Sequence, residues 1–302
     1  MRFAAIKHNG KEQAAVLDKA SKAIPLPSIN GHFNKFWPND LFELLQPENF
    51  KPFQQWWKDQ SREETDQVER IASPEYGPLY RHPSKIWGIG LNYVDHASDL
   101  DEQAPQGEPA SFMKPDTTII GHGDRICLPH QSERTTGEAE LGIIIGEECK
   151  DVSVEDAKQV IAGYTTIIDM TAEDILKRNP RYLTRSKSFD TFFSFGPQLV
   201  TPDEIGDLDQ LEVATILNGE RHRSNKVANM TFPPYDLVSF HSQVMTLKPG
   251  DIISTGTPGA IVLRDGDIIE CQIDGFPALK NPVNDLKNNR KAGTRYGSTV
   301  KR

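Results

Sequence analysis

The segment Gly137-Glu138-Ala139-Glu140-Leu141-Gly142-Ile143-Ile144-Ile145-Gly146 constrains the fold of this chain more than any other. Its β-branched run favours a strand, and alternate side chains of a strand face opposite sides of the sheet. Glu138 and Glu140 are therefore expected on one face, where like charges repel unless a cation lies between them. Taken alone, the pair fits two solvated glutamates on a surface strand slightly better than a cation site.

The length and charge of the chain exclude some classes of function. A chain of 302 residues is long enough for one large domain or two modest ones. Its net charge of −9 argues against general binding to nucleic acid or to anionic membranes, because both need a basic surface. An anionic substrate is compatible with this charge if local positive charge or a metal binds it.

The cysteines and the apolar runs indicate a cytoplasmic protein. Cys127, Cys149 and Cys271 are far apart and odd in number, so neither structural disulfides nor a zinc site is expected. Charge appears too early at the N-terminus for a signal peptide. No run approaches the roughly twenty apolar residues that a membrane span needs.

The first 75 residues are expected to form a small α+β domain. Asn9-Gly10 separates two alternating runs, which is a strong hairpin signal. Helical patterns follow over residues 39–46 and 52–71. A segment rich in proline and glycine, residues 73–78, is expected to link this domain to the next.

The catalytic domain is expected at residues 84–285, before a polar, basic tail at 286–302. Short strands dominate it and alternate only sometimes with helices, which favours an α+β fold built mainly on β-structure over a doubly wound parallel sheet. Residues 100–118 lack periodicity and are expected to form a long loop, which is a candidate lid over substrate. Strands are expected at 85–93, 125–128, 138–145, 163–171, 211–217, 251–259 and 268–273, and helices at 154–162, 172–178 and 234–245.

Four other residues could join the glutamate pair in a site. Asp169 ends a β-branched strand, and three carboxylates with water would suit Mg²⁺ or Mn²⁺. His96 and Asp99 stand three residues apart, so the carboxylate could orient the imidazole as a general base, although a capping aspartate beside a histidine is the commoner case. Lys187 is by default a solvated lysine.

Familiar nucleotide and nucleophile motifs are absent from the sequence. Gly88-x-Gly90 lacks the third glycine of a dinucleotide fingerprint, and no helix is expected to open there. The sequence contains no Walker A loop, no nucleophile elbow and no HExxH motif.

Taken together, these residues resemble the fumarylacetoacetate hydrolase family, which includes acylpyruvate hydrolases and oxaloacetate decarboxylases. The resemblance covers roughly residues 84–283, and six blocks in the family's order make it specific. The blocks are Ile89-Gly90-Leu91-Asn92-Tyr93-Val94-Asp95-His96-Ala97, Glu138-Ala139-Glu140-Leu141, Gly163-Tyr164-Thr165 with Asp169-Met170-Thr171, Ser186-Lys187-Ser188-Phe189-Asp190 with Gly196-Pro197, Leu217-Asn218-Gly219-Glu220, and Leu247-Lys248-Pro249-Gly250-Asp251-Ile252-Ile253-Ser254-Thr255-Gly256-Thr257-Pro258.

The resemblance assigns roles to the candidate residues. It implies that Glu138, Glu140 and Asp169 bind Mg²⁺ or Mn²⁺, that His96 belongs to a catalytic dyad, and that Lys187 is the active-site lysine. It also implies a mixed, strongly β α+β catalytic domain, often in a homodimer, and an extra N-terminal domain like residues 1–75.

Three departures from the family pattern affect the substrate rather than the metal site. Asp99 stands where the dyad usually has glutamate, and Gly137 stands where tyrosine often precedes the first ligand. Around the third ligand, Ile168 and Glu173 replace the usual asparagine and arginine.

The resemblance and the site chemistry together predict an enzyme that acts on a small carbonyl acid through an enolate. The first hypothesis is a metal-dependent hydrolase of a C–C bond in an acylpyruvate or fumarylacetoacetate-like acid. The second is an oxaloacetate decarboxylase, which needs the same enolate but no attacking water. The third is a weakened relative that binds a metal and a small acid or acts through protein partners.

Overall fold

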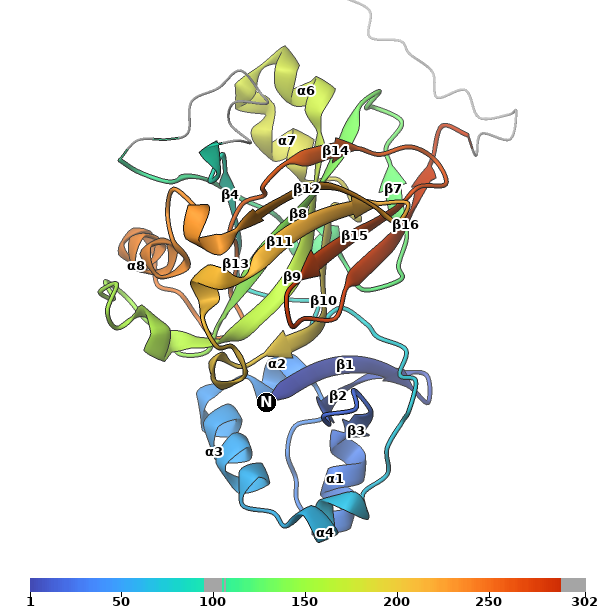
Figure 1. Cartoon of the computed structure of the whole chain (residues 1–302), viewed down its shortest axis with the longest axis vertical. Helices are drawn as coiled ribbons and strands as arrows, with labels where there is room; N and C mark the ends of the chain where they lie inside the picture. Colours follow the sequence, from blue (N-terminus) through green and yellow to red (C-terminus); the bar gives the residue numbers. More distant parts are fainter. Residues whose placement is uncertain (95–104, 106, 289–302) are drawn as a thin grey trace, which may run out of the picture.

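The computed structural model describes residues 1–94, 105 and 107–288. Within them, the strands form one sheet of eleven and one of five (Figure 1). The large sheet contains β1 (Arg2–His8), β2 (Lys11–Leu17), β3 (Ala23–Pro25), β4 (Ile86–Gly90), β5 (Ala110–Met113), β6 (Ile119–Ile120), β8 (Thr135–Ile145), β9 (Ile161–Ala172), β10 (Phe193–Val200), β13 (Ile252–Ser254) and β14 (Ala260–Val262). The small sheet contains β7 (Ile126–Leu128), β11 (Glu212–Leu217), β12 (Glu220–Lys226), β15 (Ile268–Ile273) and β16 (Leu279–Asp285).

The helices are short and lie around the sheets (Figure 1). They are α1 (Leu26–Phe33), α2 (Leu41–Leu44), α3 (Pro47–Lys58), α4 (Arg62–Asp66), α6 (Glu173–Arg178), α7 (Leu183–Lys187) and α8 (Pro234–Val244). Single 3-10 turns occur at Asp116–Thr118, Ala157–Val160, Pro180–Tyr182, Pro202–Glu204, Leu208–Gln210 and Val227–Asn229. In the part of the chain that the structure describes, no helix has the length and apolar character that a membrane crossing requires.

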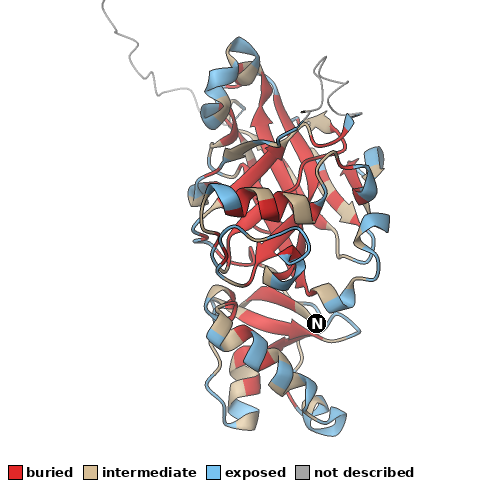
Figure 2. Ribbon diagram, turned by 90° about the vertical axis from the view of Figure 1, so that its left-hand side faces the viewer, coloured by how far each residue is buried: buried red, intermediate tan, exposed pale blue. Residues whose placement is uncertain are grey.

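The strands β8 and β9 form the centre of the large sheet, whose order is β3-β2-β1-β10-β9-β8-β13-β4-β5. They pair antiparallel along almost their whole length, and every residue in both is buried. Across the molecule, buried residues are concentrated in the strands and exposed residues in the helices and loops (Figure 2). The expected α+β fold with mainly β-structure is confirmed.

One face of β8 packs against the small sheet. The backbone N–H of Ala139 donates to Thr215 Oγ1 at 3.3 Å, which joins β8 to β11. A Cβ atom at Gly137 would lie 2.5 Å from the Cδ1 atom of Ile269 in β15. Glycine at 137 therefore permits the two sheets to approach each other here, while the neighbouring glutamates face the other side.

The N-terminal hairpin forms as the Asn-Gly signal predicts. His8 pairs with Lys11 at the end of the β1–β2 ladder, and Asn9 and Gly10 both have positive φ, at 51° and 73°. Such a turn matches the right-handed twist of the two strands. The hairpin then joins the large sheet, because Phe3 of β1 pairs with Leu199 of β10.

The segment expected as a linker lies against β1. The backbone N–H of Lys7 donates to the carbonyl of Glu75 at 2.7 Å, and that of Gly77 donates to Ala5 at 2.9 Å. Residues 73–78 are thus held by backbone hydrogen bonds to the first strand. The domain limits of 1–75 and 84–285 stay predictions.

The prediction of a helix over residues 154–162 is wrong. Only a 3-10 turn forms at Ala157–Val160, and Ile161 already begins β9. Ser153 does accept a hydrogen bond from the backbone N–H of Asp156 at 3.2 Å, so the local capping signal is present. Because Ile161 pairs with Ile145 of β8, sheet pairing shortens the segment below the length at which a helix is stable.

Two other segments differ from the sequence expectations. The helix expected over 52–71 breaks between α3 and α4, where Ser61 forms a capping box with Glu64. Within the loop expected at 100–118, the described part includes strand β5, which pairs with β4. Of the expected tail at 286–302, only 286–288 belong to the described residues.

Phe3 should be a main source of stability where the N-terminal segment meets the large sheet. Its fully buried ring lies 5.2 Å from the ring of Phe50 and 6.0 Å from that of Phe53. We expect Phe3→Ala to lower the free energy of unfolding by about 3–5 kcal/mol in urea titrations. The matched control, Phe36→Ala, removes a ring that is 92% exposed and should change it by less than about 0.5 kcal/mol. Equal effects of the two variants would contradict this packing role.

Candidate metal centre

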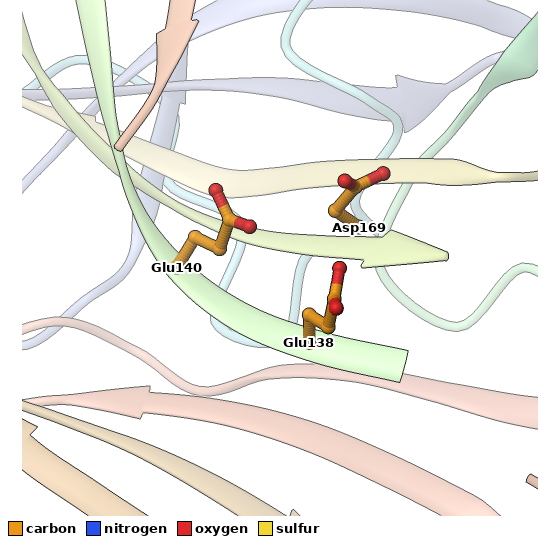
Figure 3. A group of neighbouring side chains, drawn as sticks. All are labelled: Glu138, Glu140 and Asp169. Carbon is orange, nitrogen blue, oxygen red and sulfur yellow. The ribbon is translucent and has the colours of Figure 1, made fainter. Parts of the chain in front are cut away.

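Two adjacent strands bring three carboxylates together. Glu138 of β8 stands directly opposite Asp169 of β9 in the antiparallel ladder, and Glu140 follows two residues along β8 on the same face. Each side chain offers an oxygen within 4.8 Å of an oxygen of the others, as the close-up shows (Figure 3). The same-face arrangement predicted for the two glutamates is thus present, and the sheet register supplies the third carboxylate.

All three carboxylates are buried, and burial makes their charges costly. Exposed fractions are 7% for Glu138, 2% for Glu140 and 0% for Asp169. Burial, followed by the charges of Asp169 and Glu138, raises the pKa of Glu140 to about 8. The cluster therefore favours any group that brings positive charge close to these oxygens.

Lys187, the last residue of α7, donates to two of the carboxylates. Its Nζ atom lies 2.7 Å from Glu138 Oε2 and 2.6 Å from Asp169 Oδ2. Burial disfavours the ammonium, but the charges of Asp169, Glu138 and Glu140 outweigh it and raise the pKa of Lys187. The lysine is therefore a buried cation of the cluster and not a solvated residue.

Lys114 is a second cation that the sequence reasoning missed. It directly follows β5, and its buried Nζ donates to Asp169 Oδ1. Burial opposes the negative charge of Asp169, yet the two lysines outweigh it and hold the pKa of that carboxyl below its usual range. No spacing in the sequence relates Lys114 to the carboxylates, because its contact with Asp169 joins residues 55 positions apart, near the ends of strands β5 and β9 that are not neighbours in the sheet.

The carboxylate of Glu140 is held by the turn after β13. Ser254 Oγ donates to Glu140 Oε2 at 2.5 Å, and the backbone N–H of Gly256 donates to the same atom at 2.9 Å. Gly256 has a φ of 95°, and a Cβ there would lie 2.8 Å from the Cβ of Asn92. Glycine is needed here for both the conformation and the close approach of the two turns.

The donor set fits a hard divalent cation. Glu138, Glu140 and Asp169 offer only oxygen ligands, which suit Mg²⁺ or Mn²⁺ and not zinc. Their placement on two central, fully buried strands gives the three carboxylates a rigid support. Burial is the main cause of the raised pKa of Glu140, and a bound cation would oppose it by favouring the ionised carboxylate.

His96 and Asp99, the predicted dyad, lie outside the described residues. The described chain before them is anchored beside the cluster. Asn92 donates to the carbonyl of Thr255 at 2.8 Å and accepts from the backbone N–H of Phe232 at 2.8 Å.

Glu173, which stands four residues after Asp169, is paired with two cations. It lies 8% exposed at the start of α6, where Arg134 donates to one of its oxygens and Lys177 lies 2.6 Å from the other. Burial opposes its charge, but the hydrogen bonds from Lys177 and Arg134 outweigh it and lower the pKa of Glu173. The acid at this position is therefore neutralised locally.

Several proteins are similar to this chain over about two thirds of its length. An uncharacterized protein of Archaeoglobus fulgidus is 44% identical over 66% of this chain and 78% of its own length. The mitochondrial oxaloacetate tautomerase of Xenopus laevis is 37% identical over 67% of this chain and 66% of its own length. A 2,4-didehydro-3-deoxy-L-rhamnonate hydrolase of Sphingomonas is 36% identical over 72% of this chain and 79% of its own length.

Solved structures are similar over 94% of this chain, which includes the N-terminal segment. A fumarylacetoacetate hydrolase of Exiguobacterium antarcticum matches over 99% of its length with a TM-score of 0.79 and 29% identity. A maleylpyruvate hydrolase of Sphingobium, in complex with manganese and pyruvate, matches over 99% of its length with a TM-score of 0.77 and 27% identity. The family model for the C-terminal part of fumarylacetoacetate hydrolase matches residues 85–284. The chain belongs to the fumarylacetoacetate hydrolase family.

Proposed function

We propose that this chain is a divalent-metal-dependent enzyme that hydrolyses a C–C bond in a small 1,3-dicarbonyl acid, such as an acylpyruvate, through an enolate. The observation that carries the proposal is the buried cluster of three carboxylates with two lysine ammonium groups. The similar maleylpyruvate hydrolase, which was crystallised with manganese and pyruvate, supports both the metal and the substrate class.

The proposed ligands of Mg²⁺ or Mn²⁺ are Glu138, Glu140 and Asp169. When bound, such a cation polarises the carbonyl oxygens of a 2-oxo acid. The carboxylates themselves stay fixed during the reaction, because Glu140 is hydrogen-bonded to Ser254 and Gly256, and Asp169 to both lysines.

The proposed role of Lys187 is to stabilise the enolate. Water adds to the distal carbonyl, the C–C bond breaks, and its electron pair becomes the enolate of the departing 2-oxo acid, which a proton then quenches. An ammonium that is already in place stabilises this charge without reorganisation, and a buried site strengthens the interaction. We propose His96, oriented by Asp99, as the base that takes the proton from the attacking water.

A second candidate reaction acts on oxaloacetate. The 37% identical relative from Xenopus laevis is an oxaloacetate tautomerase, and tautomerisation moves a proton from carbon to oxygen through the enolate, with neither an attacking water nor C–C bond cleavage. Decarboxylation of oxaloacetate needs the same enolate and releases carbon dioxide. The cluster of carboxylates and lysines suits all three reactions, so the reaction depends on groups around it.

A substrate panel separates these reactions. With Mn²⁺ present, we expect acetylpyruvate to lose its diketone absorbance and to yield acetate and pyruvate. Interconversion of the keto and enol forms of oxaloacetate without pyruvate would instead favour the tautomerase, and pyruvate from oxaloacetate alone would favour the decarboxylase. If no substrate turns over while Mn²⁺ still binds, the chain is a weakened relative and the proposed hydrolase is wrong.

Metal binding should stabilise the fold by mass action. At about 100 times its dissociation constant, Mn²⁺ should add about 2.7 kcal/mol and raise Tm by roughly 5 °C in thermal scans. Glu138→Gln should abolish most of this shift, because it removes a charged ligand. The matched control is Glu147→Gln. Glu147 follows the end of β8 far from the cluster and pairs with Lys51, so this variant should keep the shift. A shift retained in Glu138→Gln would remove the proposed metal site.

Replacing Lys187 should affect turnover strongly. Lys187→Met keeps an unbranched side chain but removes the ammonium that faces Glu138 and Asp169. On the substrate that the panel identifies, we expect kcat to fall by about 10²–10³. Lys58→Met, at a half-exposed lysine, serves as the control and should leave kcat unchanged. An unchanged kcat for Lys187→Met would exclude enolate stabilisation by this residue.

A further inference from the structure

An aromatic ring covers one side of the buried Lys187 ammonium. The Nζ atom of Lys187 lies 4.8 Å from the centroid of the Phe112 ring in β5. A cation within about 6 Å of a ring centroid is attracted to the electron-rich face of the ring. The ammonium thus contacts two carboxylates, from Glu138 and Asp169, and one π-face.

The ring occupies a place that a glycine leaves open. Gly88 of β4 and Phe112 of β5 are direct partners in the antiparallel ladder. A Cβ atom at Gly88 would lie 2.2 Å from Cζ of the ring and 2.3 Å from Cε2. Both atoms belong to the far end of the Phe112 side chain, so a methyl group at Gly88 would displace the ring from its position.

Strand β5 presents two groups to the same site. Phe112 and Lys114 are two residues apart, so their side chains leave this stretch on the same side, whereas Met113 points to the other side and is 36% exposed. Lys114 contacts Asp169, and Phe112 contacts Lys187. Strand β5 and the residue after it therefore place a ring against Lys187 and an amine against Asp169.

We propose that Phe112 is a positioning residue for Lys187. The Phe112 ring lies over Gly88, holds the Lys187 ammonium against Glu138 and Asp169, and keeps water from that ammonium. The inference rests on the proposed function of Lys187 toward the enolate. Without the ring, Lys187 gains freedom to turn away from the carboxylates, which lowers the fraction of molecules that have the ammonium in place for the transition state.

Activity measurements test this role on the substrate of the panel. Phe112→Leu keeps an apolar side chain but removes the π-face, and we expect kcat to fall about 3- to 30-fold with little change in KM. Phe112→Tyr keeps the ring and should restore kcat to within about twofold. Gly88→Ala, which displaces the ring, should reproduce the loss, and Met113→Leu should leave kcat unchanged. Thermal scans of every variant identify any loss that comes from unfolding.

A double-mutant cycle separates positioning from packing. In the Lys187→Met background, Phe112→Leu should cost no further activity, because the group that the ring positions is gone. An equal loss in both backgrounds would show that the ring acts through packing alone. The proposal is also overturned if Phe112→Tyr loses as much activity as Phe112→Leu.

A measurement without substrate keeps the proposal testable if the proposed function fails. Acetylation of Lys187 by trace acetic anhydride, followed by mass spectrometry, reports how accessible the amine is. We expect it to rise severalfold in Phe112→Leu, relative to Lys58 as the internal reference. Equal acetylation in both chains would overturn the positioning role, whereas a rise without turnover of any substrate would overturn only the enzymatic role.

Discussion

Three buried like charges are the constraint on which the rest of the site depends. Glu138, Glu140 and Asp169 cannot all be ionised in a dry interior unless positive charge lies beside them. Lys114 and Lys187 lie beside them, and each donates a hydrogen bond to a different oxygen of Asp169. Burial raises the pKa of Glu140 to about 8 and lowers that of Lys114, so a divalent cation bound here would favour the ionised form of Glu140 and offset the cost of burying it.

The two sheets make this arrangement rigid. The central strands β8 and β9 carry the carboxylates on one face, while the other face of β8 packs against the small sheet. The three carboxylates project from strands that are buried along their whole length, which restricts their movement. Glycines at 137 and 256 allow the neighbouring backbones to approach. A preformed site of this kind lowers the cost of binding.

The cluster by itself does not distinguish between the reactions proposed for this chain. The carboxylates and lysines suit any reaction that passes through an enolate, and relatives that share this family include a tautomerase and hydrolases. Glu173 is neutralised by Arg134 and Lys177 and so offers no free charge to a substrate. Any substrate specificity is therefore expected from other residues around the cluster.

The sequence by itself determined those features of this protein that depend on interactions between neighbouring residues. The alternation of a strand put Glu138 and Glu140 on one face, and Asn9-Gly10 set the first hairpin, because both depend only on neighbouring residues. Only the tertiary structure decided that Asp169 stands opposite Glu138, since strand register arises from long-range pairing. The same pairing overrode the helix expected at 154–162, and the tertiary fold also brought Lys114 to Asp169. These contacts join residues far apart in the chain, and no local pattern encodes such distances.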